Sequence, residues 1–102
     1  MATKKIAGIV GRIAGDMRAE LEEGKAAVHR QLERGLHLVL AHNGKGYWRL
    51  AMGRKGVYPS SHEIEVCRKA FGLNTDDELW SGERVGKDGV RWMVAEYRWI
   101  EC

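Results

Sequence analysis

The residues most suited to chemistry in this sequence are basic side chains that lie close together near its middle. Residues 34–62 contain five Lys and Arg residues and no Asp or Glu, although the whole chain carries a net charge of only +3. Cationic side chains on strands can bind phosphates, and exposed aromatic rings can stack on unpaired bases. The candidate residues for binding a nucleic acid or another partner are Arg34, Lys45, Tyr47, Arg49, Arg54 and Lys55.

We expect the basic hairpin to engage a protein or nucleoprotein complex, and direct binding of a nucleic acid is the alternative. The same basic segment could also be neutralised within the chain. Residues 76–102 have four basic and seven acidic side chains, so they could supply the neutralising charge. Alternation along a strand over residues 47–52 puts Trp48 on one face and Tyr47 with Arg49 on the other. We therefore expect Trp48 in the core and only Tyr47 beside Arg49.

The histidines and cysteines do not have the spacing of a metal site. His37 and His42 are five positions apart and should face opposite sides of a strand. His62 and Cys67 are also five positions apart, and on a helix they would lie about 140° round from each other. A zinc ion needs ligands that converge on one point. We expect no metal and no cofactor.

Catalysis is a weaker interpretation of the sequence. Small basic α+β ribonucleases offer the best enzymatic comparison, in which a histidine and a glutamate act as acid and base with an arginine on the phosphate. The corresponding candidates are His37, His42, Glu63 and Arg49, and they would work together only if the fold gathers them. Ser60 is expected to cap a helix rather than act as a nucleophile. We expect a binding protein rather than an enzyme.

The first element that must position these residues is an amphipathic N-terminal helix. Apolar residues recur at spacings of three, four or seven from residue 4 to residue 34, which is typical of a buried helical stripe. Unbroken, it would span about 45 Å and overhang a domain of this size. We favour a break near Gly15, with Asp16 capping a second helix that runs to Arg34. Otherwise the first turns protrude and pack on another molecule, which could be a second copy of the chain in a homodimer. The contact would then use a smooth face formed by Gly8, Gly11 and Gly15.

Two β-hairpins are expected after this helix. Residues 36–42 and 47–54 are rich in aliphatic side chains and flank a glycine-rich turn, which predicts the first hairpin. Residues 79–85 and 90–100 predict the second hairpin. Three tryptophans of the second hairpin are expected to fill the core: Trp80, Trp92 and Trp99.

A short helix is expected between the hairpins. Ser60 and Glu63 have the spacing of a capping box, and Gly72 provides a stop. Together these elements predict an α+β fold, in which a long N-terminal helix packs on an antiparallel sheet of two hairpins. The length of 102 residues predicts a single domain spanning residues 1–102.

Composition excludes several classes of protein. A membrane-spanning helix needs about 18 to 20 apolar residues, and no segment approaches this length, so no membrane partner is expected. Arg12 interrupts the apolar N-terminal stretch, which is then too short for a signal peptide. Two cysteines, Cys67 and Cys102, do not form a disulfide framework. They suit a reducing compartment, and we expect a cytoplasmic protein.

Several short motifs lie in the second half of the sequence: Trp48-Arg49-Leu50-Ala51, Pro59-Ser60 with Glu63, Arg68-x-Ala70-Phe71-Gly72 and Arg98-Trp99. Together, over about residues 46–99, they resemble small uncharacterised domains encoded by phages and prophages. That family has no established activity, so the resemblance carries over no functional residue. It implies an accessory protein of a mobile element, and an inhibitor of a host defence or nucleic-acid-processing complex would suit that origin.

Overall fold

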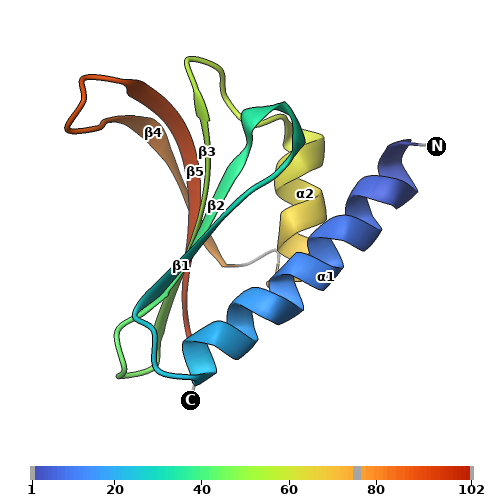
Figure 1. Ribbon diagram of the computed structural model, residues 1–102, viewed down its shortest axis with the longest axis vertical. Helices are drawn as coiled ribbons and strands as arrows, with labels where there is room; N and C mark the ends of the chain where they lie inside the picture. Colours follow the sequence, from blue (N-terminus) through green and yellow to red (C-terminus); the bar gives the residue numbers. More distant parts are fainter. Residues whose placement is uncertain (1, 75–76, 102) are drawn as a thin grey trace.

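Five antiparallel strands form a single sheet, and two helices lie against one face of it (Figure 1). The computed structural model describes residues 2–74 and 77–101. The elements are α1 (Ala2–Glu22), β1 (Ala27–Gln31), a 3-10 turn (Glu33–Gly35), β2 (His37–His42), β3 (Tyr47–Lys55), α2 (Ser61–Ala70), β4 (Glu78–Val85) and β5 (Arg91–Ile100). The strand order in the sheet is β1-β2-β3-β5-β4. This arrangement confirms the predicted α+β class, with the N-terminal helix packed on the sheet.

Helix α1 is continuous over its 21 residues, so the predicted break near Gly15 is wrong. Its buried stripe passes Gly15 without interruption, because Val10, Met17 and Leu21 all face the core. Packing of this stripe outweighs the low helix propensity of one glycine. A helix of this length rises about 30 Å, which the molecule accommodates within its longest dimension of 37 Å.

The predicted second helix running to Arg34 is also wrong, because β1 occupies that part of the chain. Gly24 adopts a positive φ of 108° just after α1 and lets the chain turn back toward the sheet. Val28 and Leu32 are four positions apart, and this spacing places two side chains on one face of a helix and equally on one face of a strand. The apolar spacing was therefore ambiguous at this point.

Both predicted hairpins and the helix between them are confirmed. The capping box at the start of α2 is complete: the Ser60 hydroxyl accepts from the Glu63 N–H, and the Glu63 carboxylate accepts from the Ser60 N–H. Gly72 follows the helix at a φ of 71°, a left-handed conformation that glycine adopts readily. Strand β1 then joins the edge of the first hairpin by pairing with β2.

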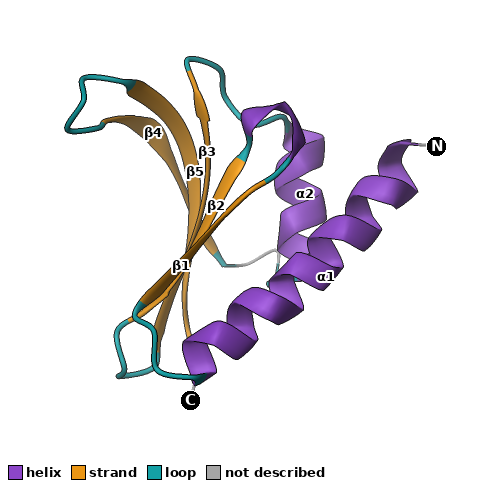
Figure 2. Cartoon of the chain, in the orientation of Figure 1, coloured by secondary structure: helices purple, strands orange, loops and turns teal. Residues whose placement is uncertain are grey.

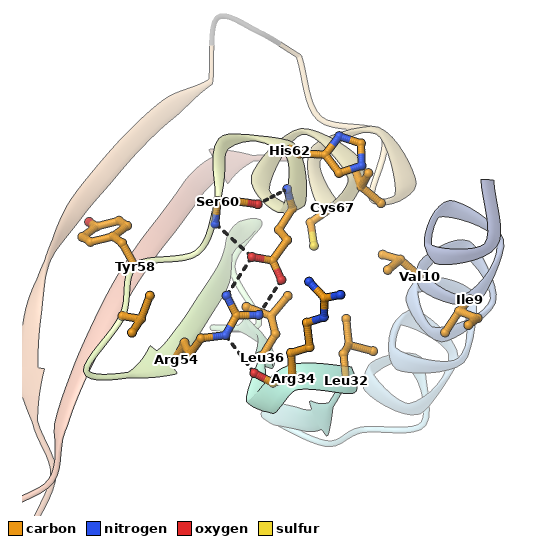
Figure 3. Close-up of a pocket in the computed structure, with 13 residues that line it drawn as sticks. Ile9, Val10, Leu32, Arg34, Leu36, Arg54, Tyr58, Ser60, His62 and Cys67 are labelled. Carbon is orange, nitrogen blue, oxygen red and sulfur yellow. Dashed lines mark hydrogen bonds and ion pairs between the residues drawn. The ribbon is translucent and has the colours of Figure 1, made fainter. Parts of the chain in front are cut away.

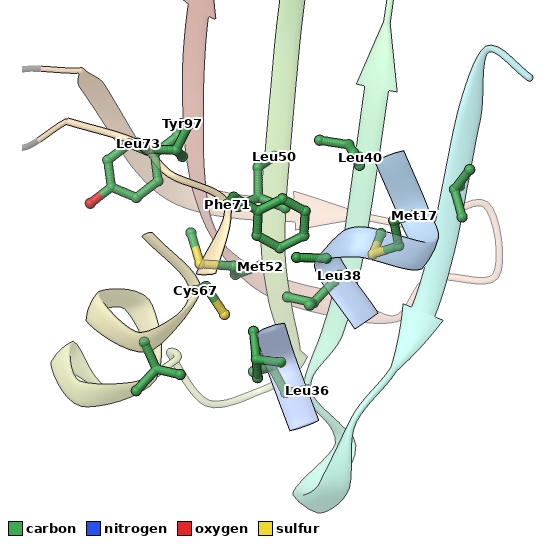
Figure 4. Close-up of a cluster of buried hydrophobic side chains, with 14 of the residues drawn as sticks. Met17, Leu36, Leu38, Leu40, Leu50, Met52, Cys67, Phe71, Leu73 and Tyr97 are labelled. Atoms are coloured by element: carbon green, nitrogen blue, oxygen red, sulfur yellow. The ribbon is translucent and has the colours of Figure 1, made fainter. Parts of the chain in front are cut away.

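The core lies between the helices and one face of the sheet (Figure 4). Leu38, Leu40, Leu50 and Met52 on the central strands have no exposed surface, and Met17 of α1 packs against them. Neither described helix covers the opposite face of the sheet (Figure 2). None of the helices in residues 2–74 and 77–101 is long and apolar enough to cross a membrane.

The continuity of α1 predicts that Gly15→Ala stabilises the protein by about 0.5–1 kcal/mol, because alanine has the higher helix propensity. A methyl group at Gly15 would meet no atom within 4 Å. Gly72→Ala is the matched control and should destabilise the protein, because Gly72 has a positive φ. Thermal unfolding of both variants measures the difference. A loss of stability in Gly15→Ala would contradict a continuous helix.

Candidate functional site

The candidate site is the face of the sheet away from the helices, which we call the open face. Alternation along each strand and the pairing between strands decide which side chains share it. Arg49 on β3 lies opposite Arg98 on β5, and Glu96 on β5 lies opposite Trp80 on β4. The charged and aromatic members of the open face are His29, His37, Tyr47, Arg49, Lys55, Glu78, Trp80, Arg84, Trp92, Glu96 and Arg98.

Three arginines from three strands converge on one carboxylate on the open face. Glu96 is completely buried. Arg84 donates from its two terminal nitrogens to the two Glu96 oxygens at 3.1 and 3.3 Å. Arg98 donates its Nε–H to Glu96 Oε2 at 2.7 Å, and Arg49 Nε lies 3.7 Å from Oε1. We call Arg49, Arg84 and Arg98 the arginine cluster.

The arginine cluster leaves an excess of positive charge on the open face. Its three side chains are 40–55% exposed, whereas the carboxylate that they share is not exposed at all. In the described part of the chain, Glu96 is the one carboxylate within ion-pair distance of these guanidinium groups. A buried carboxylate satisfied by charge-assisted hydrogen bonds fixes the positions of its partners. The remaining guanidinium N–H groups suit an anion, and above all a phosphate.

Aromatic rings lie beside the cluster, contrary to the expectation that three tryptophans fill the core. The Arg84 guanidinium sits 4.6 Å from the centre of a Trp80 ring, and the Lys55 ammonium sits 5.5 Å from that of Trp92. Both tryptophans are half-buried on the open face. Of the three, Trp99 alone packs against the core, on the helix side. The two open-face indoles thus place flat apolar surface beside the cations.

A histidine pair lies on the open face of β1 and β2, where His37 packs edge-on against Trp92 at a centroid distance of 4.7 Å. His29 Nε2 and His37 Nδ1 are 2.7 Å apart, and the rings stack with centroids 4.9 Å apart. Burial lowers the pKa of His37, and the nearby His29 and Lys55 lower it further. His37 therefore favours the neutral form, in which one ring nitrogen of the pair donates to the other. No group of three or more potential metal ligands occurs among the described residues.

A hollow of 670 Å³ adjoins the cluster at the end of the sheet nearest the β2–β3 loop. Its lining includes Tyr47, Arg49, Arg98 and Ile100 together with one acidic residue, Glu78, and Tyr47 and Ile100 are more than half exposed. Two cluster arginines thus share a concavity with an exposed aromatic ring. Such a concavity can hold a charged group and a flat group together.

The predicted binding residues are divided between the two sides of the sheet. As expected, Trp48 turns toward the helices and is partly buried against the core, while its neighbours in β3 turn outward. Lys45 is exposed in the β2–β3 loop, and Arg34 and Arg54 lie on the helix side. The three that reach the open face are Tyr47, Arg49 and Lys55.

Arg54 is already engaged by an acidic partner. It donates to the two Glu63 oxygens at 2.8 and 2.5 Å, and both side chains are less than one-fifth exposed. These hydrogen bonds are the largest cause that lowers the pKa of Glu63, to about 2. Arg54 therefore contributes to stability rather than to a basic surface. The acid that neutralises Arg54 comes from α2, whereas Arg49 pairs with Glu96, which lies in residues 76–102 as the charge distribution suggested.

The four ribonuclease candidates do not share one site, although His42 and Arg49 both line the hollow at the end of the sheet. His37 and Arg49 lie on the open face, whereas His42 packs against Trp48 on the helix side at a centroid distance of 4.4 Å. Glu63 is held in the α2 capping box and the Arg54 ion pair. The predicted helix-packing residues Gly8, Gly11 and Gly15 are exposed on α1, and a methyl group at any of them would meet nothing within 4 Å. Their role as a dimer face stays a prediction.

Sequence reasoning did not select Arg84, Glu96, Arg98 or either open-face tryptophan as part of a site. One signal was available, because Glu96 and Arg98 lie on the face of a strand that otherwise carries Trp92 and Val94. A carboxylate and a guanidinium two positions apart on such a face indicate a paired, partly buried charge. The contribution of Arg84 depends on the pairing of β4 with β5, which the charges alone do not reveal.

Comparison of the chain with protein-family models, with curated proteins and with solved structures found no match.

The acid stability of the protein should depend on Glu63. Its pKa of about 2 in the folded protein lies below the ordinary 4.5, so its ionised form stabilises the fold above about pH 4.5 and loses this effect as the pH falls toward 2. Glu63→Gln keeps the capping-box pattern but removes the charge. We expect it to lower the free energy of unfolding at pH 7 by up to about 3 kcal/mol and by much less at pH 2.5.

Urea unfolding at several pH values measures this difference. Glu65→Gln is the control, because Glu65 lies on the same helix but is about half exposed and should matter little at either pH. Equal acid sensitivity in the wild type and Glu63→Gln would contradict the role of the Arg54–Glu63 pair.

Glu96→Gln should destabilise the protein by about 2–3 kcal/mol, because it leaves three neighbouring arginines without their shared counter-charge. Added salt should recover part of the loss by screening the repulsion. Glu83→Gln is the control, since Glu83 is exposed and pairs with the exposed Arg91 at 3.6 Å. Thermal unfolding at low and high salt measures both effects. Similar melting temperatures for the two variants would mean that Glu96 does not organise the cluster.

Proposed function

We propose that this protein is a small non-catalytic binding module that holds a single-stranded nucleic acid on the open face of its sheet. The observation that carries the proposal is the convergence of Arg49, Arg84 and Arg98 on Glu96, beside the rings of Trp80 and Trp92. Cations and aromatic rings interleaved on one surface are the combination that single-strand binding uses.

Preorganisation of the arginines supports this proposal. An arginine on a free surface loses side-chain entropy when it binds a phosphate. Glu96 already restricts the three guanidinium groups, so less freedom is lost on binding. Their planar N–H groups match phosphate oxygens better than an ammonium group does. A strand of phosphates could therefore cross the sheet over Arg49 and Arg98, which are neighbours on paired strands.

The aromatic residues favour a single strand over a duplex. Bases of a duplex are stacked on each other, whereas unpaired bases expose their faces to aromatic side chains. Tyr47 lies in the hollow that Arg49 and Arg98 also line. A base stacked on Tyr47 would then leave its phosphate beside the two arginines.

The same face would also suit a nucleoprotein complex in which a nucleic-acid strand is accessible. The resemblance to phage-encoded domains is the support for action on a host defence or nucleic-acid-processing complex. A protein partner with carboxylates in place of phosphates is the second candidate, because the cluster arginines would pair with these as well.

Binding of labelled single-stranded RNA, single-stranded DNA and duplex DNA at about 50 and 200 mM salt tests the proposal. With about four phosphates engaged by the cluster and Lys55, log K for a single strand should fall against log salt with a slope near −3. Arg49→Gln combined with Arg98→Gln should reduce the steepness by about 1.4 and weaken binding at 50 mM salt by about tenfold or more. Arg84 remains to pair with Glu96 in this variant.

Arg12→Gln is the matched control, because Arg12 is exposed on α1, which packs on the other side of the sheet. It should bind like the wild type. Absence of single-strand binding at 50 mM salt would reject the proposal. Equal losses in Arg12→Gln and the double variant would reject the open face as the site. Binding of poly-glutamate but of no nucleic acid would establish a carboxylate-bearing protein partner instead.

A further inference from the structure

A second concavity lies on the helix side of the sheet, between the N-terminal half of α1, the β1–β2 turn and the start of α2 (Figure 3). It has a volume of 470 Å³, within the range of about 300–1,000 Å³ typical of small-molecule sites. Most of its wall is apolar, and the aliphatic side chains in it include Ile9, Leu32, Val57 and Val66. Ile9 and Val57 are large apolar side chains left 42% and 61% exposed. We call this concavity the cleft.

Arg34 provides the cleft with a cation (Figure 3). The side chain of this exposed residue rises from the β1–β2 turn into the space between α1 and α2. The other two charged residues of the lining, Arg54 and Glu63, are paired with each other. Among the described side chains, no carboxylate lies within ion-pair distance of Arg34. The cleft therefore combines aliphatic walls with one net positive charge.

The backbone conformation at Arg34 indicates that the arginine side chain has a function at this position. Arg34 has a φ of 59°, and it is the one residue other than glycine with a positive φ in the described part of the chain. Asparagine or glycine adopts this conformation with less strain. The Arg54 Nε–H donates to the Arg34 carbonyl at 2.9 Å, and Glu63 fixes Arg54 in turn. The hydrogen bond from Arg54 thus holds Arg34 in a backbone conformation that arginine does not favour, and such conformations are common at ligand-binding positions.

We propose that the cleft binds a small aliphatic carboxylate, with its chain against the apolar walls and its carboxylate on the Arg34 guanidinium. Burial of the chain supplies the affinity, in proportion to the apolar area removed from water. The charge-assisted hydrogen bonds of Arg34 select a carboxylate over a neutral or cationic head group. This site is independent of the open face, which lies on the opposite side of the sheet.

Calorimetric titration of the full chain with decanoate, decanol, decyltrimethylammonium and acetate tests the proposal, below the concentrations at which the amphiphiles form micelles. Decanoate should bind at least about tenfold more tightly than decanol, as expected for a charge-assisted hydrogen bond at a partly exposed site. The cation should bind more weakly still, and acetate should not bind measurably because it lacks the chain. Amide chemical shifts should change around the cleft on addition of decanoate.

Arg34→Gly separates binding from folding. It should weaken decanoate binding by about tenfold, to the affinity of decanol, while the melting temperature stays the same or rises because the strained turn is relieved. Ile9→Glu should also weaken decanoate by placing a negative charge in the apolar wall. Lys87→Gln, which removes a charge from the exposed β4–β5 turn, is the matched control and should bind like the wild type.

Three results would overturn the proposal. The first is equal affinity for decanoate and decanol, which would mean nonspecific apolar binding. The second is unchanged decanoate affinity in Arg34→Gly. The third is a set of shift changes confined to the open face, which would assign the carboxylate to the arginine cluster.

Discussion

The buried carboxylate of Glu96 is the interaction on which the open face depends. A glutamate with no exposed surface on a central strand is costly unless its charge and lone pairs are satisfied. Neither helix is available to supply a partner, because both pack on the other face. The neighbouring strands must therefore supply the arginines from within the sheet. Since three arginines share one carboxylate, burial of this single negative charge leaves the open face with a net positive charge.

The one-sided packing of the helices explains why this surface stays accessible. The large aliphatic side chains of β2 and β3 face α1 and α2, and they form the core. Their neighbours on the open face are small where the strands are most central, as at Ala51 and Gly53. Side chains from β5 cover one of these small residues, because a methyl group at Gly53 would lie 3.4 Å from Val94 and 3.5 Å from the Trp92 ring. Gly82 illustrates the closeness of this packing, because a methyl group there would lie 2.6 Å from the Trp80 ring.

The parts of the fold that were predictable from sequence are those fixed by local signals. The capping box of Ser60 and Glu63 and the turns of the two hairpins act over a few residues, and all of them were located correctly. Strand β1 was missed because its apolar spacing fits a helix equally well. The arginine cluster was missed for a different reason. Its members are gathered by the pairing of β3 with β5 and of β5 with β4, and no local pattern specifies which strands become neighbours.

The acid-free segment shows why charge along a sequence is a poor guide to charge on a surface. Arg49 and Arg54 are five positions apart on one strand, so alternation sends them to opposite sides of the sheet. On one side, Arg49 belongs to a cluster in which three positive charges share a single negative carboxylate. On the other, Glu63 cancels Arg54, and the neutral pair serves to hold the turn that carries Arg34. A single basic segment thus contributes to two separate positive sites, the arginine cluster and Arg34 in the cleft. On each side of the sheet, an acidic partner leaves some of the basic side chains with unneutralised charge.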